Sequence, residues 1–283
     1  MLELNALVIL YVIGTSCFIM VSKDKNNRSR PFYLFVNGCI ILWESFPYFM
    51  SISEPSLEVL YQWTPLILLP LLHRETALIT KALGKPALDP SFIHFEKKYF
   101  PAVMNIHHQN RANYKWLSEF LHFCYLSHFF LIYGVPLYFY LKHEMLPFYI
   151  ATFSILFVMF ACFLTHGFMP VFGPRNIFEK MKDSRSHGFF FKVVHVILEA
   201  GSTDGTAFPS GHTAVAFVII LITYYLNTPL FYFLFPICIG LIVSTVYGRF
   251  HYVMDVFFGI IYAMIAFVVT VFLFHHSFGV SYD

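Results

Sequence analysis

The chain has 283 residues and a formal net charge of +2, from 18 Lys and Arg against 16 Asp and Glu. Only 12% of the residues are charged, whereas 58% are hydrophobic and 20% aromatic; soluble domains carry about 25% charged residues. So few charges cannot cover the surface of a water-soluble globule, which excludes a soluble enzyme, a nucleic-acid-binding protein and a disordered chain. The composition predicts a multi-pass membrane protein.

A membrane-spanning helix needs roughly 20 mostly apolar residues, and seven runs approach that length. An eighth run, residues 59–73, is short and contains Pro65 and Pro70, so spanning, kinking and dipping all stay open for it. We predict an all-α bundle of seven or eight transmembrane helices, with N-terminal transmembrane helices over 1–58 and a second domain over 59–283. The seven runs are residues 4–22, 32–52, 116–141, 145–168, 211–227, 230–248 and 255–274.

Two connections are longer than the short hairpins between the other runs. In residues 74–115, Phe92, Phe95 and Tyr99 recur at helical spacing beside two lysines, which predicts a helix lying flat on the membrane interface. Residues 169–208 hold more charged groups and glycines than a linker needs. Long ordered loops are usually functional, so the second connection is expected to contribute to a site.

The most informative stretch is Phe208-Pro209-Ser210-Gly211-His212-Thr213, which leads into an apolar helix from Ala214. Ser210 is a natural N-cap residue, and the unpaired N–H groups of a helix start, together with the helix dipole, bind anions. Gly211 lets an anion approach the backbone closely, and His212 lies within reach of it. The segment therefore predicts an anion site; the alternative is an ordinary capped membrane helix with an interfacial histidine.

His251 and Asp255 stand four residues apart, a spacing that places them on one face of a helix within hydrogen-bonding distance. A carboxylate bonded to one ring nitrogen fixes the tautomer and leaves the other nitrogen as a nucleophile. Ionisable groups at the end of a membrane helix are costly and mark functional sites by default. The alternative is an interfacial His–Asp pair, with Arg249 reaching lipid headgroups.

Arg175 follows Gly173 and Pro174, just after the apolar run that ends near Phe168. A guanidinium on such a restrained backbone offers a planar fork for phosphate oxygens, although a basic residue at a helix end more often only sets topology. Together the three clusters supply charged clamps, a nucleophile, a general acid and an orienting carboxylate. A phosphoester hydrolase needs this set of groups.

At these residues the sequence resembles the type 2 phosphatidic acid phosphatase superfamily, integral membrane lipid phosphatases and phosphotransferases related to vanadium haloperoxidases. The second motif of that superfamily, Pro-Ser-Gly-His, matches at residues 209–212. In the third motif, Ser244, His251 and Asp255 stand in the usual places. The resemblance covers roughly residues 60–275 and implies a six-helix phosphatase-type core.

The chain departs from the usual motifs at two places. Thr245 stands where the third motif has arginine, and Arg249 supplies a cation one helical turn later on the same face. The first motif is reduced to Gly173-Pro174-Arg175, with Phe168 at the lysine position. These departures resemble the inositol phosphorylceramide synthase-like branch. Two nearby basic residues are candidates to replace the missing lysine, Lys180 and Lys182.

The resemblance implies a two-step reaction on a lipid phosphate at the bilayer. His251, held by Asp255, attacks phosphorus to form a phosphohistidine, and His212 protonates the departing alkoxide. Water then releases phosphate, or a second alcohol accepts the phosphoryl group, and neither a metal nor another cofactor is required. The equatorial phosphate oxygens are held by Arg175, Arg249, Ser210 and the N–H of Gly211.

Two interpretations from other classes compete with this one. A non-catalytic lipid-binding or transport protein that kept the fold would predict loss of at least one of His212, His251 or Asp255, and all three are present. A metal site built from the same side chains is disfavoured because the nearby arginines repel a cation. Loss of activity in EDTA would support the metal site.

Glu119, His122 and Tyr125 share one helical face. Hydrogen bonding between helices is the favoured interpretation of this face, and contact with a lipid headgroup or an acceptor is the alternative.

The side of the membrane on which the active site lies depends on residues 59–73. If they do not span the membrane, the active site faces the exterior, and if they do, it faces the cytoplasm. The superfamily precedent favours the non-cytoplasmic interface. The first loop is marked as cytoplasmic by the positive-inside rule, through Lys23, Lys25, Arg28 and Arg30.

Overall fold

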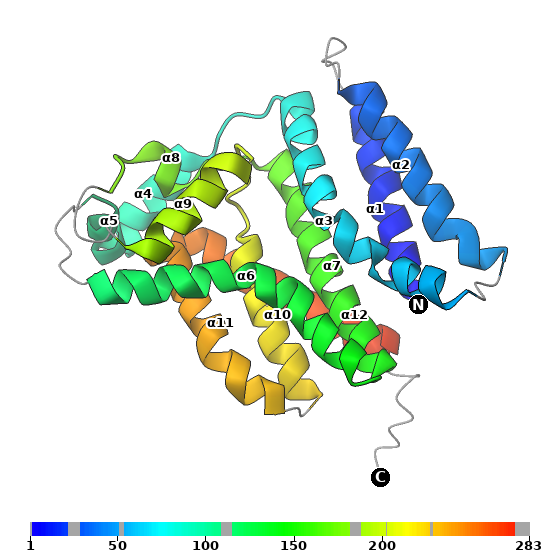
Figure 1. The fold of residues 1–283 in the computed structure, drawn as a ribbon. Coiled ribbons are helices and arrows are strands. Elements are labelled where there is room, and N and C mark those ends of the chain that lie inside the picture. Colours follow the sequence, from blue (N-terminus) through cyan, green and yellow to red (C-terminus); the bar gives the residue numbers. More distant parts are fainter. Residues whose placement is uncertain are drawn as a thin grey trace.

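The computed structural model describes residues 2–21, 29–50, 54–108, 115–181, 188–201, 203–226 and 229–274. Within these ranges the chain is all-α, as predicted, with twelve α-helices and one 3-10 turn (Figure 1). In chain order they are α1 (Leu2–Val21), α2 (Arg30–Ser45), η1 (Phe46–Tyr48), α3 (Pro55–Leu83), α4 (Asp89–Tyr99), α5 (Pro101–His108), α6 (Lys115–Leu141), α7 (Met145–Phe168), α8 (Pro174–Ile177), α9 (Phe189–Gly201), α10 (Gly211–Tyr225), α11 (Pro229–Tyr247) and α12 (Val253–Phe274).

Five helices in the described ranges, α1, α6, α7, α11 and α12, are long and apolar enough to cross a membrane. Two other apolar runs form shorter helices than their length in the sequence suggests. The run 32–52 ends as a helix at Ser45 and continues as the turn η1, and the run 211–227 gives the 15-residue α10. The number of transmembrane helices, seven or eight, therefore stays a prediction, because α2 and α10 are shorter than the roughly 20 residues that cross a membrane.

The run 59–73 is part of one continuous helix, α3, which has 29 residues and contains Pro65 and Pro70. The helix ends at Gly84, whose left-handed backbone (φ 56°) lets its N–H bond the carbonyl of Thr80. α3 packs against α7 and α1. Its polar C-terminal half, beginning at His73, is thereby carried along the side of α7.

α7 and α10 form the centre of the bundle. α7 packs against α3, α6, α10 and α12, and α10 packs against α12, α11 and α7. Both helices are apolar on nearly every face, as buried helices are: Phe148, Leu156 and Cys162 of α7 and Val215 and Val218 of α10 are fully buried. Side chains that project from these two helices are therefore held in fixed positions.

The short helices α4, α5, α8 and α9 gather on one side of the bundle, away from α1 and α2 (Figure 1). The helix predicted from Phe92, Phe95 and Tyr99 is present as α4, and its position at the membrane interface stays a prediction. Its buried face consists of Asp89, Phe92 and Glu96, whereas Tyr99 is exposed. Since two of those three buried residues are carboxylates, α4 packs into the protein through hydrogen bonds as well as through apolar contact.

Candidate active site

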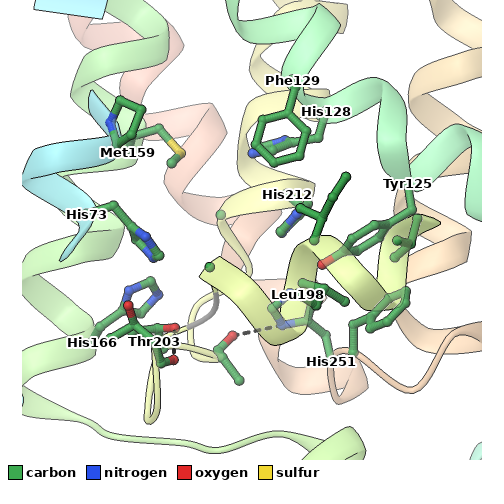
Figure 2. Close-up of a pocket in the computed structure, with 18 of the residues that line it drawn as sticks. His73, Tyr125, His128, Phe129, Met159, His166, Leu198, Thr203, His212 and His251 are labelled. Atoms are coloured by element: carbon green, nitrogen blue, oxygen red, sulfur yellow. Dashed lines mark hydrogen bonds between the residues drawn. The ribbon is translucent and has the colours of Figure 1, made fainter. Parts of the chain in front are cut away.

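A cavity of about 400 Å³ lies where α3, α6, α7, α9 and α10 meet (Figure 2). Its volume falls in the range of small-molecule sites, and its wall is mostly apolar with a few polar groups, as such sites usually are. Five histidines from four helices and one turn line it: His73, His128, His166, His212 and His251. Arg74 and Arg175 also line it.

The segment 209–212 forms the predicted helix start. Ser210 is the N-cap of α10: its Oγ accepts a hydrogen bond from the Thr213 N–H at 3.2 Å. The Ser210 N–H donates to the carbonyl of Asp255 at 3.0 Å, which ties the start of α10 to the start of α12. Gly211 and His212 line the cavity. Ser210 itself is fully buried, and its hydroxyl caps the helix.

The His251 ring is oriented by two hydrogen bonds at Nδ1. This nitrogen donates to the carbonyl of Ala207 at 2.9 Å and to Oδ2 of Asp255 at 3.3 Å. A backbone carbonyl can only accept, so the proton is assigned to Nδ1 and the lone pair to Nε2. Asp255 is fully buried, and its Oδ2 also accepts from the Tyr252 N–H at 2.8 Å. The predicted His–Asp pair is thus present in the structure.

The segment around His251 is not helical, although the four-residue spacing suggested a shared helix face. α11 ends at Tyr247 and α12 begins at Val253, so His251 lies in the turn between them and Asp255 lies in the first turn of α12. The turn forms because the N–H groups of Phe250 and His251 both donate to the carbonyl of Thr245 at 2.9 Å. The hydrogen bond survives because the turn still directs the imidazole back towards α12.

His212 lies beside His251, with 5.8 Å between the ring centroids. Its ring stacks on Tyr125 at 4.4 Å and lies 4.1 Å from the ring of His128. These aromatic neighbours on α6 fix the plane of the imidazole. The structure therefore brings the two predicted histidines to the same cavity.

Arg175 reaches the cavity from α8, immediately after a restrained turn. Gly173 adopts a left-handed backbone (φ 82°), and a Cβ added there would lie 2.7 Å from the carbonyl oxygen of Phe250. Only glycine permits this close approach. The Gly-Pro-Arg sequence thus places the segment before Arg175 directly against the turn that carries His251.

Arg249 lies elsewhere than predicted. It was expected one helical turn after Thr245 on the same face, but it follows the end of α11 and has a left-handed backbone (φ 60°). Its side chain is buried, and Nη1 donates to the carbonyl of Glu179 at 3.0 Å. Arg249 is not among the described residues that line the cavity. Through this hydrogen bond Arg249 holds the segment that follows α8 in place.

Asp89 is a buried carboxylate that the sequence analysis missed. Its Oδ2 accepts from the Phe172 N–H and its Oδ1 from the Gly173 N–H, both at 2.9 Å. Oδ1 also accepts from the Tyr252 hydroxyl at 3.2 Å. Burial, and then the Asp89 charge, raise the pKa of the Tyr252 phenol, which keeps it a donor. One carboxylate therefore joins the turn before Arg175 to the neighbour of His251.

We expect Asp89→Asn to lower kcat/KM for a phosphate ester about tenfold, because the amide cannot accept from three donors as the carboxylate does. The affinity for orthovanadate, which mimics a five-coordinate phosphorus, should fall in step, since Arg175 loses its fixed position. Inhibition constants measured beside turnover check this. Asp204→Asn, at an exposed turn residue, is the matched control. A lower melting temperature with unchanged vanadate affinity would contradict a positioning role.

Glu119 caps α9 from the neighbouring helix α6. Its Oε2 accepts from the N–H groups of Phe189 and Phe190 at 2.8 and 3.1 Å, and its Oε1 from that of Phe191 at 3.3 Å. A Cβ at Gly188 would clash with Oε1 of Glu119, so glycine leaves room for the cap. Hydrogen bonding between helices, the favoured interpretation of Glu119, is confirmed. The cap holds α9, which lines the cavity through Val194, Ile197 and Leu198.

Of the two lysines expected to replace the first-motif lysine, the structure describes Lys180, which does not line the cavity. Lys180 pairs with Glu199 at 3.4 Å on the surface, and Phe168, which stands at the lysine position, is 44% exposed. Lys182 lies outside the described residues, as do Lys23, Lys25 and Arg28 of the first loop. Arg74 of α3 lines the same cavity as Arg175, and no motif in the sequence indicated it.

The fold and the cavity define an all-α protein with helices suited to a membrane and a histidine- and arginine-lined site. Within the described ranges, no three His, Cys, Asp or Glu side chains are grouped so that they could hold a metal ion. A family model described as the PAP2 superfamily matches residues 90–269, which is more than half of the chain. The chain belongs to the PAP2 superfamily. No curated protein and no solved structure matches it.

Membership in this superfamily suggests phosphatase or phosphotransferase activity on a phosphate ester. The superfamily's enzymes are generally metal-independent. The matched region starts at Pro90, inside α4. α1, α2 and α3, including His73 and Arg74, therefore lie outside it.

Proposed function

We propose that this chain is an integral membrane enzyme that hydrolyses or transfers the phosphoryl group of a lipid phosphate through a phosphohistidine at His251. The observation that carries the proposal is the double hydrogen bond from Nδ1 of His251 to Ala207 and Asp255. It assigns the lone pair to Nε2 of a ring that lines the cavity. A nucleophile oriented by a buried carboxylate is the arrangement that covalent catalysis requires.

In the first step, Nε2 of His251 forms a bond to phosphorus, and the bond between phosphorus and the lipid oxygen breaks. His212 gives its proton to that oxygen, so an alcohol leaves rather than an alkoxide. The ring centroids of the two histidines are 5.8 Å apart, and both rings line the cavity. Asp255 stabilises the positive charge that the His251 ring acquires.

In the second step, the hydroxyl oxygen of water or of an alcohol bonds to phosphorus and the N–P bond breaks. His212 takes the proton of the attacking hydroxyl and is ready for the next cycle. Water yields inorganic phosphate, whereas an alcohol yields a new phosphate ester. The resemblance of Gly173-Pro174-Arg175 to the inositol phosphorylceramide synthase-like branch favours transfer.

Positive charge and N–H groups stabilise the oxygens of the transferring phosphoryl group. Arg175 and the Gly211 N–H are the proposed contacts, since both residues line the cavity. The resemblance implies that Arg249 also contacts a phosphate oxygen. To do so, its guanidinium would have to release the carbonyl of Glu179. Ser210 acts on the phosphate by holding the start of α10. We propose that Arg74 supplies the charge of the missing first-motif lysine.

We also propose the division into N-terminal helices, residues 1–58, and a phosphatase or phosphotransferase domain, residues 59–283. The boundary falls in the first turn of α3. The proposed location of the active site is the non-cytoplasmic interface of the membrane. Labelling of single cysteines introduced at Asp204 and Asn227, with reagents that cannot cross the bilayer, tests this: the Asp204 site should react from outside.

The proposed general acid is tested by comparing two leaving groups. His212→Ala should slow phosphate release from phosphatidic acid about 10²- to 10⁴-fold, because a lipid alkoxide leaves poorly without a proton. Release from p-nitrophenyl phosphate should fall far less, since nitrophenolate is a stable anion. Steady-state assays of the detergent-purified chain, with and without EDTA, measure both. Equal losses on the two substrates would contradict the assignment of His212, and loss in EDTA would favour a metal enzyme.

A further inference from the structure

The cavity has a second polar wall that the proposed chemistry does not use. His73 of α3 and His166 of α7 line the same cavity as His212 and His251. Figure 2 shows His73 and His166 together on one side of the pocket, near Thr203, with His212, Tyr125 and His251 on the other. We refer to His73 and His166 as the second wall.

The protonation of His166 follows from its one hydrogen bond. Its Nε2 lies 3.1 Å from the carbonyl oxygen of Pro209, and because a carbonyl only accepts, Nε2 carries the hydrogen. In the neutral ring Nδ1 therefore carries a lone pair. His166 is only 3% exposed, and its Nδ1 has no hydrogen-bond partner among the described residues. A buried acceptor in this condition is unfavourable, and a bound donor would satisfy it.

Apolar side chains line the cavity beside the second wall. Met159 and Phe163 of α7 and Leu69 of α3 also line the cavity. The His73 ring packs against Phe163 with 5.1 Å between centroids, which holds it in place. A ligand with its phosphate at His251 would therefore share the cavity with apolar side chains and with a hydrogen-bond acceptor.

We propose that the second wall binds a hydroxyl group of the substrate, which donates its hydrogen to Nδ1 of His166. This inference rests on the proposed function. A neutral imidazole lone pair repels an anionic oxygen, so a second phosphate or carboxylate does not suit the site. Arg74 and Arg175 line the same cavity, and their charges repel an ammonium group. A neutral hydroxyl meets both conditions.

The hydroxyl has two possible sources with the same chemistry. It belongs either to the headgroup of the phosphate-donating lipid or to a separate alcohol that receives the phosphoryl group. In the first case the second wall selects the donor lipid. In the second case it raises the yield of transfer relative to hydrolysis.

Two variants change the polar atoms of the second wall while they keep its packing. His166→Gln retains a donor for the Pro209 carbonyl but replaces the ring acceptor Nδ1 with an amide oxygen at another position, and His73→Phe removes both ring nitrogens while it keeps an aromatic ring against Phe163. His94→Gln, at an exposed position of α4 outside the cavity wall, is the control. All are studied as full-length protein in detergent.

The first measurement compares kcat/KM for phosphatidylglycerol, whose headgroup has hydroxyls, with kcat/KM for phosphatidic acid, which has no headgroup beyond phosphate. The second adds glycerol to phosphatidic acid and measures glycerol phosphate against inorganic phosphate. We expect at least one of these ratios to fall about tenfold in His166→Gln, which loses the hydrogen bond accepted by Nδ1, and to change less in His73→Phe. The ratio that falls identifies the source of the hydroxyl.

Unchanged ratios in both measurements would overturn the inference, and so would a wild type that neither prefers phosphatidylglycerol nor forms glycerol phosphate. Trapping of the phosphoenzyme separates this failure from failure of the proposed function. If the wild type forms an acid-labile phosphohistidine that His251→Ala lacks, the proposed function holds and only the second wall is wrong. If no such intermediate forms, the proposed function itself is wrong.

Discussion

Replacing His251 by alanine is expected to lower kcat for phosphate release from phosphatidic acid by at least about 10³-fold, the scale seen when a covalent nucleophile is removed. The described cavity has other histidines, but Nε2 of His251 is the one whose ring is oriented by a buried carboxylate. His212 is assigned to proton transfer, and an imidazole cannot do both tasks at once. Radiolabelled phosphate release over a range of lipid concentrations gives kcat directly.

The alanine variant also removes a hydrogen bond to the Ala207 carbonyl, so a folding defect must be separated from a chemical one. His251→Gln provides this control, because it retains an N–H near the same carbonyl and cannot form a phosphohistidine. Both variants should elute from size-exclusion chromatography as the wild type does. Turnover within tenfold of wild type in either variant would refute the assigned nucleophile.

Asp255→Asn is expected to lower kcat about 10²-fold, less than loss of the nucleophile. Where a carboxylate alone sets the tautomer of its histidine, the same change costs about 10⁴-fold. Here the Ala207 carbonyl also accepts from Nδ1, at 2.9 Å, so the tautomer is kept. The loss is then the negative charge that stabilises the positively charged ring of the intermediate.

The quenched level of phosphoenzyme checks this interpretation of Asp255. Asp255→Asn should still form the intermediate, more slowly, whereas His251→Ala should form none. An Asp255→Asn variant as inactive as His251→Ala would mean that the carboxylate, not the carbonyl, fixes the tautomer. Thr270→Ser, a conservative change at a buried α12 residue away from the cavity, controls for disturbance of the helix.

Several helices could be predicted almost to the residue. The runs 116–141 and 145–168 correspond to α6, Lys115–Leu141, and α7, Met145–Phe168. These boundaries were visible because polar residues interrupt two long apolar stretches, a local signal. The end of α2 was not visible, because the apolar run continues through the turn η1. Apolar composition indicates burial, and it does not distinguish a helix from a turn.

The motif residues also divide into those whose position follows from near neighbours in the sequence and those whose position does not. The Ser210 cap depends on contacts within three residues, and the sequence predicted it. Arg249 was misplaced because a helix was assumed to continue past Tyr247. The carbonyl of Thr245 instead accepts from both Phe250 and His251 and ends the helix in a turn. That turn directs Arg249 to the Glu179 carbonyl rather than to the cavity.

The sequence by itself determined the long apolar helices that could cross a membrane, most of the other helices and the identity of the His251–Asp255 pair, because these follow from composition and from neighbours within four residues. Only the tertiary structure decided that His73 and His166 join them in one cavity. It also decided that Asp89 bonds Gly173 and Tyr252, which are 84 and 163 residues away. Such partners are chosen by the packing of distant helices, and a period of 3.6 residues does not specify which helix faces meet.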